Sequence, residues 1–177
     1  MKKIVFWTTV NRNRIPVMQY HSGFNQLKLT HEFKRTVGDC PVVLNDIFYE
    51  NIAIKNTHPF TCRDIIVFSE NGFIAPPSLT RVHAARSIDQ LFQKINTVGT
   101  CETAFVLGNE DLFQVLLASY KQYISEIHIM ELQSEDEAGG NCFPFLDPEY
   151  WNKETKDMLT ADRQNTYDAK YFIYTPA

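Results

Sequence analysis

The chain has 177 residues, of which 44% are hydrophobic and 21% are charged, and its formal net charge is −4. This composition is typical of an ordinary soluble globule, and at this length one domain spanning residues 1–177 is the simplest expectation. The acidic balance excludes the basic surface with which proteins bind nucleic acid or an anionic membrane.

The N-terminal segment, MKKIVFWTTV, has two lysines before a short apolar run. It is too short for a signal peptide and has no small-residue cleavage site, so it predicts a β-strand over residues 2–9. No apolar run approaches the ~18 residues of a membrane span.

The cysteines and histidines are dispersed along the chain. The four cysteines are Cys40, Cys62, Cys101 and Cys142. They lack the spacing of a zinc site, so we expect no bound metal. Free thiols in a reducing cytoplasm are the simplest interpretation. The five histidines are equally scattered, and we expect them to be structural or exposed.

The first half of the chain alternates between strand and helix patterns. A polar stretch predicts a long loop over residues 10–24, and apolar spacing predicts a helix within residues 25–36. PVVLN (41–45) predicts a short buried strand, and IFYENI (47–52) predicts a helical turn. DIIVFS (64–69) is a continuous apolar run, typical of a strand covered on both faces of a parallel sheet.

In the second half of the chain, strand and helix patterns alternate at first and are then followed by consecutive strands. A weaker strand over residues 79–84 precedes a helix at SIDQLFQKI (87–95), which opens with a capping-box pattern. An apolar strand ending at Gly108 leads into another helix, and EIHIMEL (126–132) predicts a strand. Residues 151–176 predict two long strands. The pattern indicates an α/β fold with a mostly parallel sheet and a C-terminal antiparallel strand pair.

The strand-to-helix corner in AFVLGNEDLFQVLL (104–117) has the form of a phosphate site. Such corners are usually rich in glycine, because backbone N–H groups must approach a phosphate closely. Here a single glycine is followed by Asn109, Glu110 and Asp111. The sequence therefore predicts an altered phosphate site lined by acids.

Five segments, in order, resemble the dihydrofolate reductase family over nearly the whole chain. They are FKRTVGDCPVVLNDIFYENI, CRDIIVFS, FVLGNEDLF, NCFPFLDPEYW and TADRQNTYDAKYFIY. The resemblance implies that family's fold, a mostly parallel central sheet with helices on both faces. It also implies NADPH-dependent reduction of dihydrofolate or a related pterin.

The resemblance assigns five positions to the substrate. Phe33 falls where the family packs a phenylalanine on the pterin, Phe24 falls where a tryptophan usually stands, and Ile52 and Leu107 line the pocket. Arg63 matches the arginine that grips a carboxylate of folate through a bidentate pair. An ordinary loop arginine is the alternative that stays open.

The family's catalytic acid is replaced by Leu29. A hydrocarbon side chain cannot donate a proton, and a general acid typically contributes about 10²–10⁴-fold to the rate. Glu32 lies three residues on, on the same helical face, and is the candidate substitute acid if its pKa is raised. The alternative is an exposed glutamate paired with Arg35.

The resemblance also assigns six positions to the cofactor, NADPH. These are Thr8, Asn45, Ser69, Gly108, Asn109 and Phe113. Beside them, the family's phosphate-binding arginine and threonine become Asp46 and Phe48, and Pro16 stands near the position at which the family's mobile active-site loop carries a glycine. These replacements predict that NADPH binding is weakened or lost.

Three functions stay open at this stage. The first is a divergent reductase that uses NADPH on dihydrofolate or a pterin. The second is a non-catalytic descendant that binds a folate, a pterin or a protein partner. The third is a reductase of the same fold that acts on another heterocycle, such as the related riboflavin-pathway reductases.

Overall fold

The computed structural model describes residues 1–17, 27–54, 63–108, 110–134 and 142–177. Two compact units divide the chain. The first contains Met1–Ile4 and Asp39–Asn109, and the second contains Val5–Gly38 and Glu110–Ala177.

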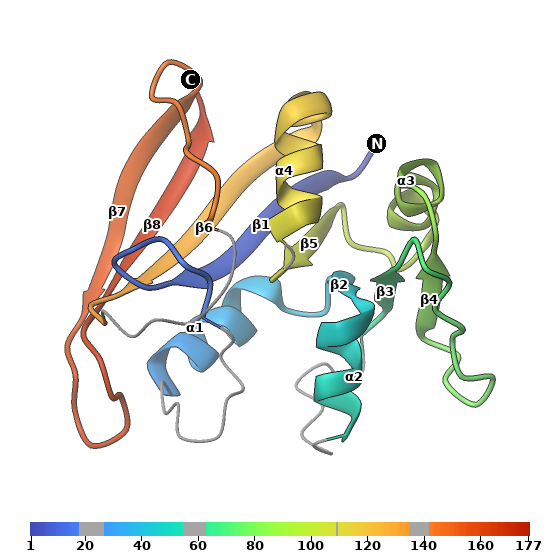
Figure 1. Ribbon diagram of the computed structural model, residues 1–177, viewed down its shortest axis with the longest axis horizontal. Coiled ribbons are helices and arrows are strands. Elements are labelled where there is room, and N and C mark those ends of the chain that lie inside the picture. Colours follow the sequence, from blue (N-terminus) through green and yellow to red (C-terminus); the bar gives the residue numbers. More distant parts are fainter. Residues whose placement is uncertain (18–26, 55–62, 109, 135–141) are drawn as a thin grey trace. The chain divides into compact units, whose positions relative to one another are not determined.

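The first unit is a parallel sheet with two helices (Figure 1). Its strands are β2 (Val42–Asn45), β3 (Ile65–Phe68), β4 (Val82–Ala85) and β5 (Thr103–Leu107). β2 pairs in parallel with β3 and with β5, and β3 pairs in parallel with β4. Helix α2 (Asp46–Ile54) follows β2, and α3 (Ile88–Thr97) follows β4. The segments between the strands return the chain each time to the end of the sheet at which the previous strand began. The strands are therefore parallel, as the alternating pattern predicts.

The apolar runs become the core of this unit. Residues 42–44 and 65–67 are at most 2% exposed, because strands covered on both faces have no polar side. The predicted cap of α3 is also confirmed. The Ser87 side chain accepts from the Gln90 backbone N–H at 3.3 Å, and the Gln90 side chain accepts from the Arg86 N–H at 3.0 Å.

The second unit combines two helices with an antiparallel strand set. Strand β1 (Lys3–Val10) begins in the first unit, where the Lys3 N–H donates to the Glu102 carbonyl at 2.8 Å, and continues into the second. The remaining elements are α1 (Leu27–Val37), α4 (Glu110–Ser119), a 3₁₀ turn (Lys121–Tyr123), β6 (Ile124–Leu132), β7 (Trp151–Leu159) and β8 (Ala169–Pro176). β8 pairs in antiparallel fashion with both β6 and β7, which confirms the predicted C-terminal strand pair.

Strand β7 presents a polar outer surface. Residues 152–158 are all exposed, and the pairing with β8 shifts register between Thr155 and Asp157. The Lys153 ammonium lies 3.7 Å from the centroid of the Phe172 ring, a cation–π contact that covers apolar surface on β8.

The eight strands follow the order β4-β3-β2-β5-β1-β6-β8-β7, so the expected α/β class is confirmed. One element is longer than predicted, because α2 is a helix of nine residues and not a single turn. The described part of the predicted loop is folded back on β1, since the Val17 N–H donates to the Thr9 carbonyl at 2.8 Å. No helix of the described part of the chain is long and apolar enough to cross a membrane.

Candidate functional site

The N-terminus of α2 is capped by its own side chains. The Asn45 Oδ1 accepts from the Phe48 backbone N–H at 2.7 Å, and the Asp46 Oδ1 accepts from the Ile47 N–H at 2.8 Å. Free N–H groups at a helix N-terminus make an anion-binding site. Here two of them already donate to oxygen atoms of the chain itself.

Ser69, which directly follows β3, joins this cap. Its hydroxyl donates a hydrogen bond to the Asp46 Oδ2, and its side chain is 6% exposed. The Ser69 backbone N–H donates to the Ala85 carbonyl at 3.0 Å, which fixes its position. The structure thus brings together two predicted cofactor residues, Asn45 and Ser69, around a carboxylate.

The end of β5 lies beside α2. Gly108 has a φ of +49°, a conformation in which a side chain is strained. A Cβ added to Gly108 would lie 4.0 Å from the Cε2 of Phe48, whose ring is 8% exposed. Leu107, the preceding residue, is 4% exposed. The retained glycine keeps the backbone form of a phosphate corner, while the phenylalanine packs beside it. Asn109 lies outside the described residues.

Arg63 is a buried residue and not an exposed loop arginine. It is 9% exposed, immediately before β3, and its guanidinium lowers the pKa of the Cys40 thiol against the larger opposing effect of burial. Ile52 lies within α2, and its side chain is outside the described part. The predicted carboxylate-gripping role of Arg63 stays a prediction.

In the second unit, Phe33 belongs to a buried aromatic cluster. The Trp7 ring lies edge-on to Phe33 at a centroid distance of 5.4 Å, and stacks on His128 at 5.1 Å with an interplanar angle of 25°. It also contacts Tyr171 at 5.7 Å. Phe33 is 4% exposed, and the Trp7 Nε1 is buried with no hydrogen-bond partner among the residues that the structure describes. Phe33 is thus part of the packed core of this unit.

A chain of hydrogen bonds runs through the same cluster. The Tyr171 hydroxyl lies 2.6 Å from the His128 Nδ1, and the His128 Nε2 lies 2.7 Å from the Glu126 Oε2. Both contacts are satisfied when Tyr171 donates to Nδ1 and Nε2–H donates to the carboxylate, a tautomer inferred from these partners. Thr36 hydrogen-bonds to the Tyr171 side chain.

Burial is the main cause of the pKa shifts of His128 and Tyr171 in this hydrogen-bonded network. It lowers the pKa of His128, although the hydrogen bond and charge of Glu126 act in the opposite direction. Burial likewise raises the pKa of Tyr171 to about 12. At neutral pH both groups are therefore uncharged. Sequence reasoning missed this network, because its members come from α1, β6 and β8, which no local spacing connects.

The candidate substitute acid forms a helix-surface ion pair. The Glu32 Oε2 lies 2.5 Å from the Arg35 Nη2, an i,i+3 contact in which the Arg35 side chain is 73% exposed. The pairing with Arg35 matches the alternative, but the Glu32 side chain is 24% exposed and therefore half-buried rather than exposed. Leu29 lies in α1, and its side chain is outside the described part, as is the whole of Phe24.

Two predicted cofactor residues in the second unit are buried. Phe113 is 0% exposed and stacks on Phe6 at 4.3 Å, with Phe143 edge-on to it at 5.6 Å. These ring contacts in the core are enough to explain why Phe113 is buried. Thr8 is 4% exposed in β1. At the start of α4, burial raises the pKa of Glu110, and the charge of the adjacent Asp111 adds to this.

The described residues contain no group of three histidine, cysteine or acidic side chains that could hold a metal ion. The carboxyl ends of β2, β3 and β5 instead present Asn45, Ser69 and Gly108 at one edge of a parallel sheet. Ligand crevices of open α/β sheets form outside such strand ends. The class of protein is thus an α/β fold with polar residues and a glycine gathered at the carboxyl ends of its parallel strands.

Comparison with known proteins gives the family. The chain matches the family model described as dihydrofolate reductase over residues 27–176. The dihydrofolate reductase of Haemophilus influenzae is 25% identical over 146 residues, covering 81% of this chain and 79% of that protein. A solved dihydrofolate reductase from Enterococcus faecalis, complexed with NADP(H) and RAB-propyl, has a TM-score of 0.77 at 16% identity, covering 98% of this chain and 96% of that one. The chain belongs to the dihydrofolate reductase family.

Proposed function

We propose that this protein is a divergent NADPH-dependent reductase of dihydrofolate or a related pterin, with weakened cofactor binding and slow turnover. The observation that carries the proposal is the edge formed by Asn45, Ser69 and Gly108 at the carboxyl ends of three parallel strands. Membership of the family supports it, and so does the Enterococcus faecalis neighbour, which is complexed with NADP(H). We also propose that the protein works in the cytoplasm.

The first unit fits a dinucleotide in backbone shape but not in charge. Gly108 has the backbone conformation that such a corner needs. However, the Asp46 carboxylate occupies the N-terminus of α2, where a phosphate group would need free donors. A carboxylate about 6 Å from a phosphate costs roughly 2–3 kcal/mol at an effective dielectric near 20. NADPH, which supplies a hydride when bound, should therefore bind weakly.

The substrate assignment rests on Phe33 and Arg63, which the family resemblance places against the pterin and a folate carboxylate. Both side chains are buried in the structure, at 4% and 9% exposure. The proton donor is the weakest part of the assignment, because Leu29 cannot act as an acid and Glu32 is paired with Arg35. Slow turnover follows, since general-acid catalysis is missing.

Two measurements on the purified protein test this proposal. The first is a calorimetric titration with NADPH in the absence of substrate, where micromolar to sub-millimolar binding is expected. The second is NADPH oxidation at 340 nm with dihydrofolate at high enzyme concentration, where slow oxidation dependent on dihydrofolate is expected. No binding at millimolar NADPH, together with no oxidation, would reject the reductase.

A second candidate is a non-catalytic protein that binds a folate, a pterin or a protein partner. The Asp46–Ser69 contact favours it, because the chain's own carboxylate takes the anion position. Binding of a folate without binding of NADPH would support this candidate. Hydride transfer to a different heterocycle would instead favour a reductase of the same fold with another substrate.

A further inference from the structure

Two cysteines of the first unit form a pair. The Cys40 thiol makes a side-chain hydrogen bond with the Cys101 thiol, and each residue is only half-buried. They lie about 60 residues apart in the sequence, but each comes just before one of two adjacent parallel strands, β2 and β5. The register between β2 and β5 pairs Val42 with Phe105, so Cys40 is level with Thr103 and Cys101 lies two residues before that level. The turn that precedes Cys101 packs against Pro41 and brings the two thiols together.

Backbone contacts hold both cysteines in place. The Pro41 carbonyl, directly after Cys40, accepts from the Phe105 N–H at 3.0 Å. The Glu102 carbonyl, directly after Cys101, accepts from the Lys3 N–H at 2.8 Å. The segment of Cys40 is thus tied to β5 and the segment of Cys101 is tied to β1, so neither thiol lies on a loose loop.

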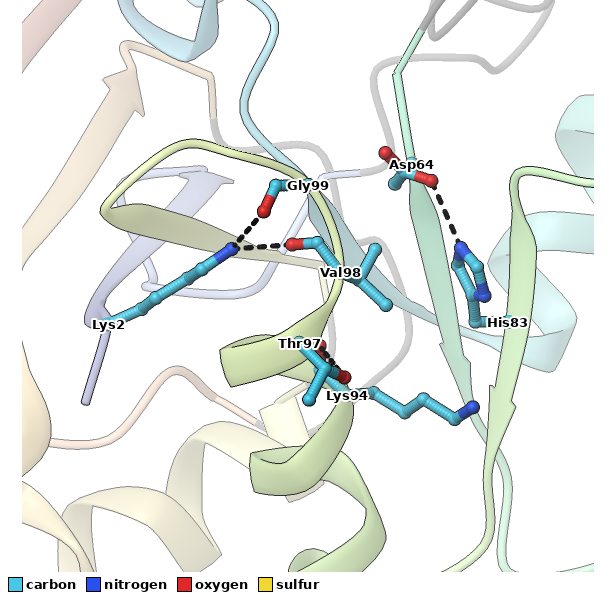
Figure 2. A network of polar contacts seen from close by, with 7 residues as sticks. All are labelled: Lys2, Asp64, His83, Lys94, Thr97, Val98 and Gly99. Atoms are coloured by element: carbon cyan, nitrogen blue, oxygen red, sulfur yellow. Dashed lines mark hydrogen bonds and ion pairs between the residues drawn. The ribbon is translucent and has the colours of Figure 1, made fainter.

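The segment before Cys101 is anchored as well. The Lys2 ammonium donates to the carbonyls of Val98 and Gly99, at 2.5 and 2.9 Å (Figure 2). Gly99 has a φ of +68°, and a Cβ added there would lie 3.6 Å from both Asp64 and Pro41. The turn therefore packs closely against the segments that precede β2 and β3.

We propose that Cys40 and Cys101 are a redox modification site, which a two-electron oxidant such as a hydroperoxide converts to an intramolecular disulfide. One thiol attacks the peroxide, the O–O bond breaks, and a sulfenic acid and water form. The second thiol then attacks that sulfur, so that the S–S bond forms, the S–O bond breaks and a second water leaves. The two thiols are oxidised by two electrons in total, and the peroxide is reduced.

The surroundings assign an order to these steps. Burial and the neighbouring Cys101 raise the pKa of Cys40 to about 12, although Arg63 opposes the shift. Cys40 therefore remains a thiol at neutral pH and is the resolving partner. Cys101 meets the oxidant first, because the thiolate is the reactive form of cysteine. The site lies at the amino ends of β2 and β5, whereas Asn45 and Gly108 lie at or beyond their carboxyl ends, so it does not depend on the proposed reductase activity.

The test is to treat the intact protein with stoichiometric hydrogen peroxide, quench with an alkylating reagent, and map the peptides by mass spectrometry. We expect a Cys40–Cys101 linked peptide, a loss of two titratable thiols, and full reversal by dithiothreitol. A second readout is thermal unfolding. Closing a loop of about 60 residues should raise the midpoint by roughly 10 °C, an upper bound on the chain-entropy model.

Three variants complete the design. Cys101→Ser should abolish the linkage and leave Cys40 alkylatable, whereas Cys40→Ser should leave Cys101 to form a sulfenic acid that a dimedone probe traps. Cys142→Ser, at an exposed cysteine, should form the disulfide as the natural chain does. The proposal is overturned if both thiols stay alkylatable at peroxide levels that modify Cys142. It is equally overturned if linkage to Cys62 or Cys142 predominates over the pair.

Discussion

The Asp46 carboxylate and the Ser69 hydroxyl, 23 positions apart in the sequence, are joined by a hydrogen bond at the start of α2. One oxygen of Asp46 thus accepts from Ser69 and the other from the helix backbone. The carboxylate contributes to the cap, and it also places a negative charge where a cofactor phosphate would dock.

Asp46→Asn should raise the affinity for NADPH by about 100-fold, because removing a charge about 6 Å from a phosphate recovers roughly 2–3 kcal/mol. Asparagine keeps an oxygen that can accept from the Ile47 N–H, and its amide N–H can donate to the Ser69 hydroxyl oxygen. Isothermal calorimetry gives the two affinities. The matched control is Asp89→Asn, an exposed acid in the first turn of α3, which should leave the affinity within twofold. Equal affinities for Asp46→Asn and the natural chain would refute the charge argument.

Under the proposed function, Leu29→Asp should increase the turnover of dihydrofolate by about 10²-fold or more, since it supplies the acid that the family resemblance assigns to this position. The increase should appear in kcat and decline as pH rises through the pKa of the new carboxyl group. Leu29→Asn introduces a side chain of the same size without an acid, and should give no increase. A rise of similar size in the asparagine variant would show that polarity and not proton donation was responsible.

The stability of the protein should fall between pH 7 and pH 5 because of His128. Burial lowers the pKa of His128 in the folded state, so the unfolded chain binds more protons below its own value of about 6.5. The contribution is fully present above that pH and is lost as the pH falls. In His128→Gln this part of the slope should disappear, although the variant is less stable by about 1–3 kcal/mol at pH 8.

Urea unfolding at several pH values measures this slope. His31→Gln, at an exposed position on α1, is the matched control and should keep the slope of the natural chain. The free energy of unfolding of His128→Gln is compared with that of the natural chain at pH 5 and at pH 8. If the difference is the same at both pH values, the neutral buried imidazole is not the source of the pH dependence.

Glu110→Gln should stabilise the protein at neutral pH. Because burial raises the pKa of Glu110 above the ordinary value of 4.5, the folded state favours the protonated acid. Its contribution is present below about pH 4.5 and is lost as the pH rises through the folded pKa. The stability difference between Glu110→Gln and the natural chain should therefore grow from pH 4.5 to pH 7 in chemical denaturation. A constant difference across that range would contradict the assignment.

Local signals in the sequence were sufficient for much of the fold. Uninterrupted apolar runs located β2 and β3, and the Ser87 and Gln90 pair located the start of α3. The α2 helix was underestimated, because its length depends on a cap at Asn45 that a turn-length apolar pattern does not reveal.

The site was harder to predict, because its contacts join residues from distant parts of the chain. Residue matching pointed to Asn45 and Ser69, but not to the hydrogen bond that Ser69 donates to Asp46, the residue after Asn45. The stacking of Trp7 on His128 depends on how β1 and β6 are brought together, which no local period encodes. In the same way, four scattered cysteines gave no indication that the thiols of Cys40 and Cys101 come into contact.

The position of β8 has a consequence for how the protein is made. β8 is the last strand in chain order, yet it lies between β6 and β7 and pairs with both. On the ribosome, β7 therefore emerges before its only neighbour in the strand order exists. An unpaired strand is a template for aggregation, which charged side chains suppress. Lys153, Glu154, Lys156 and Asp157 along β7 should keep the nascent chain soluble until β8 is translated.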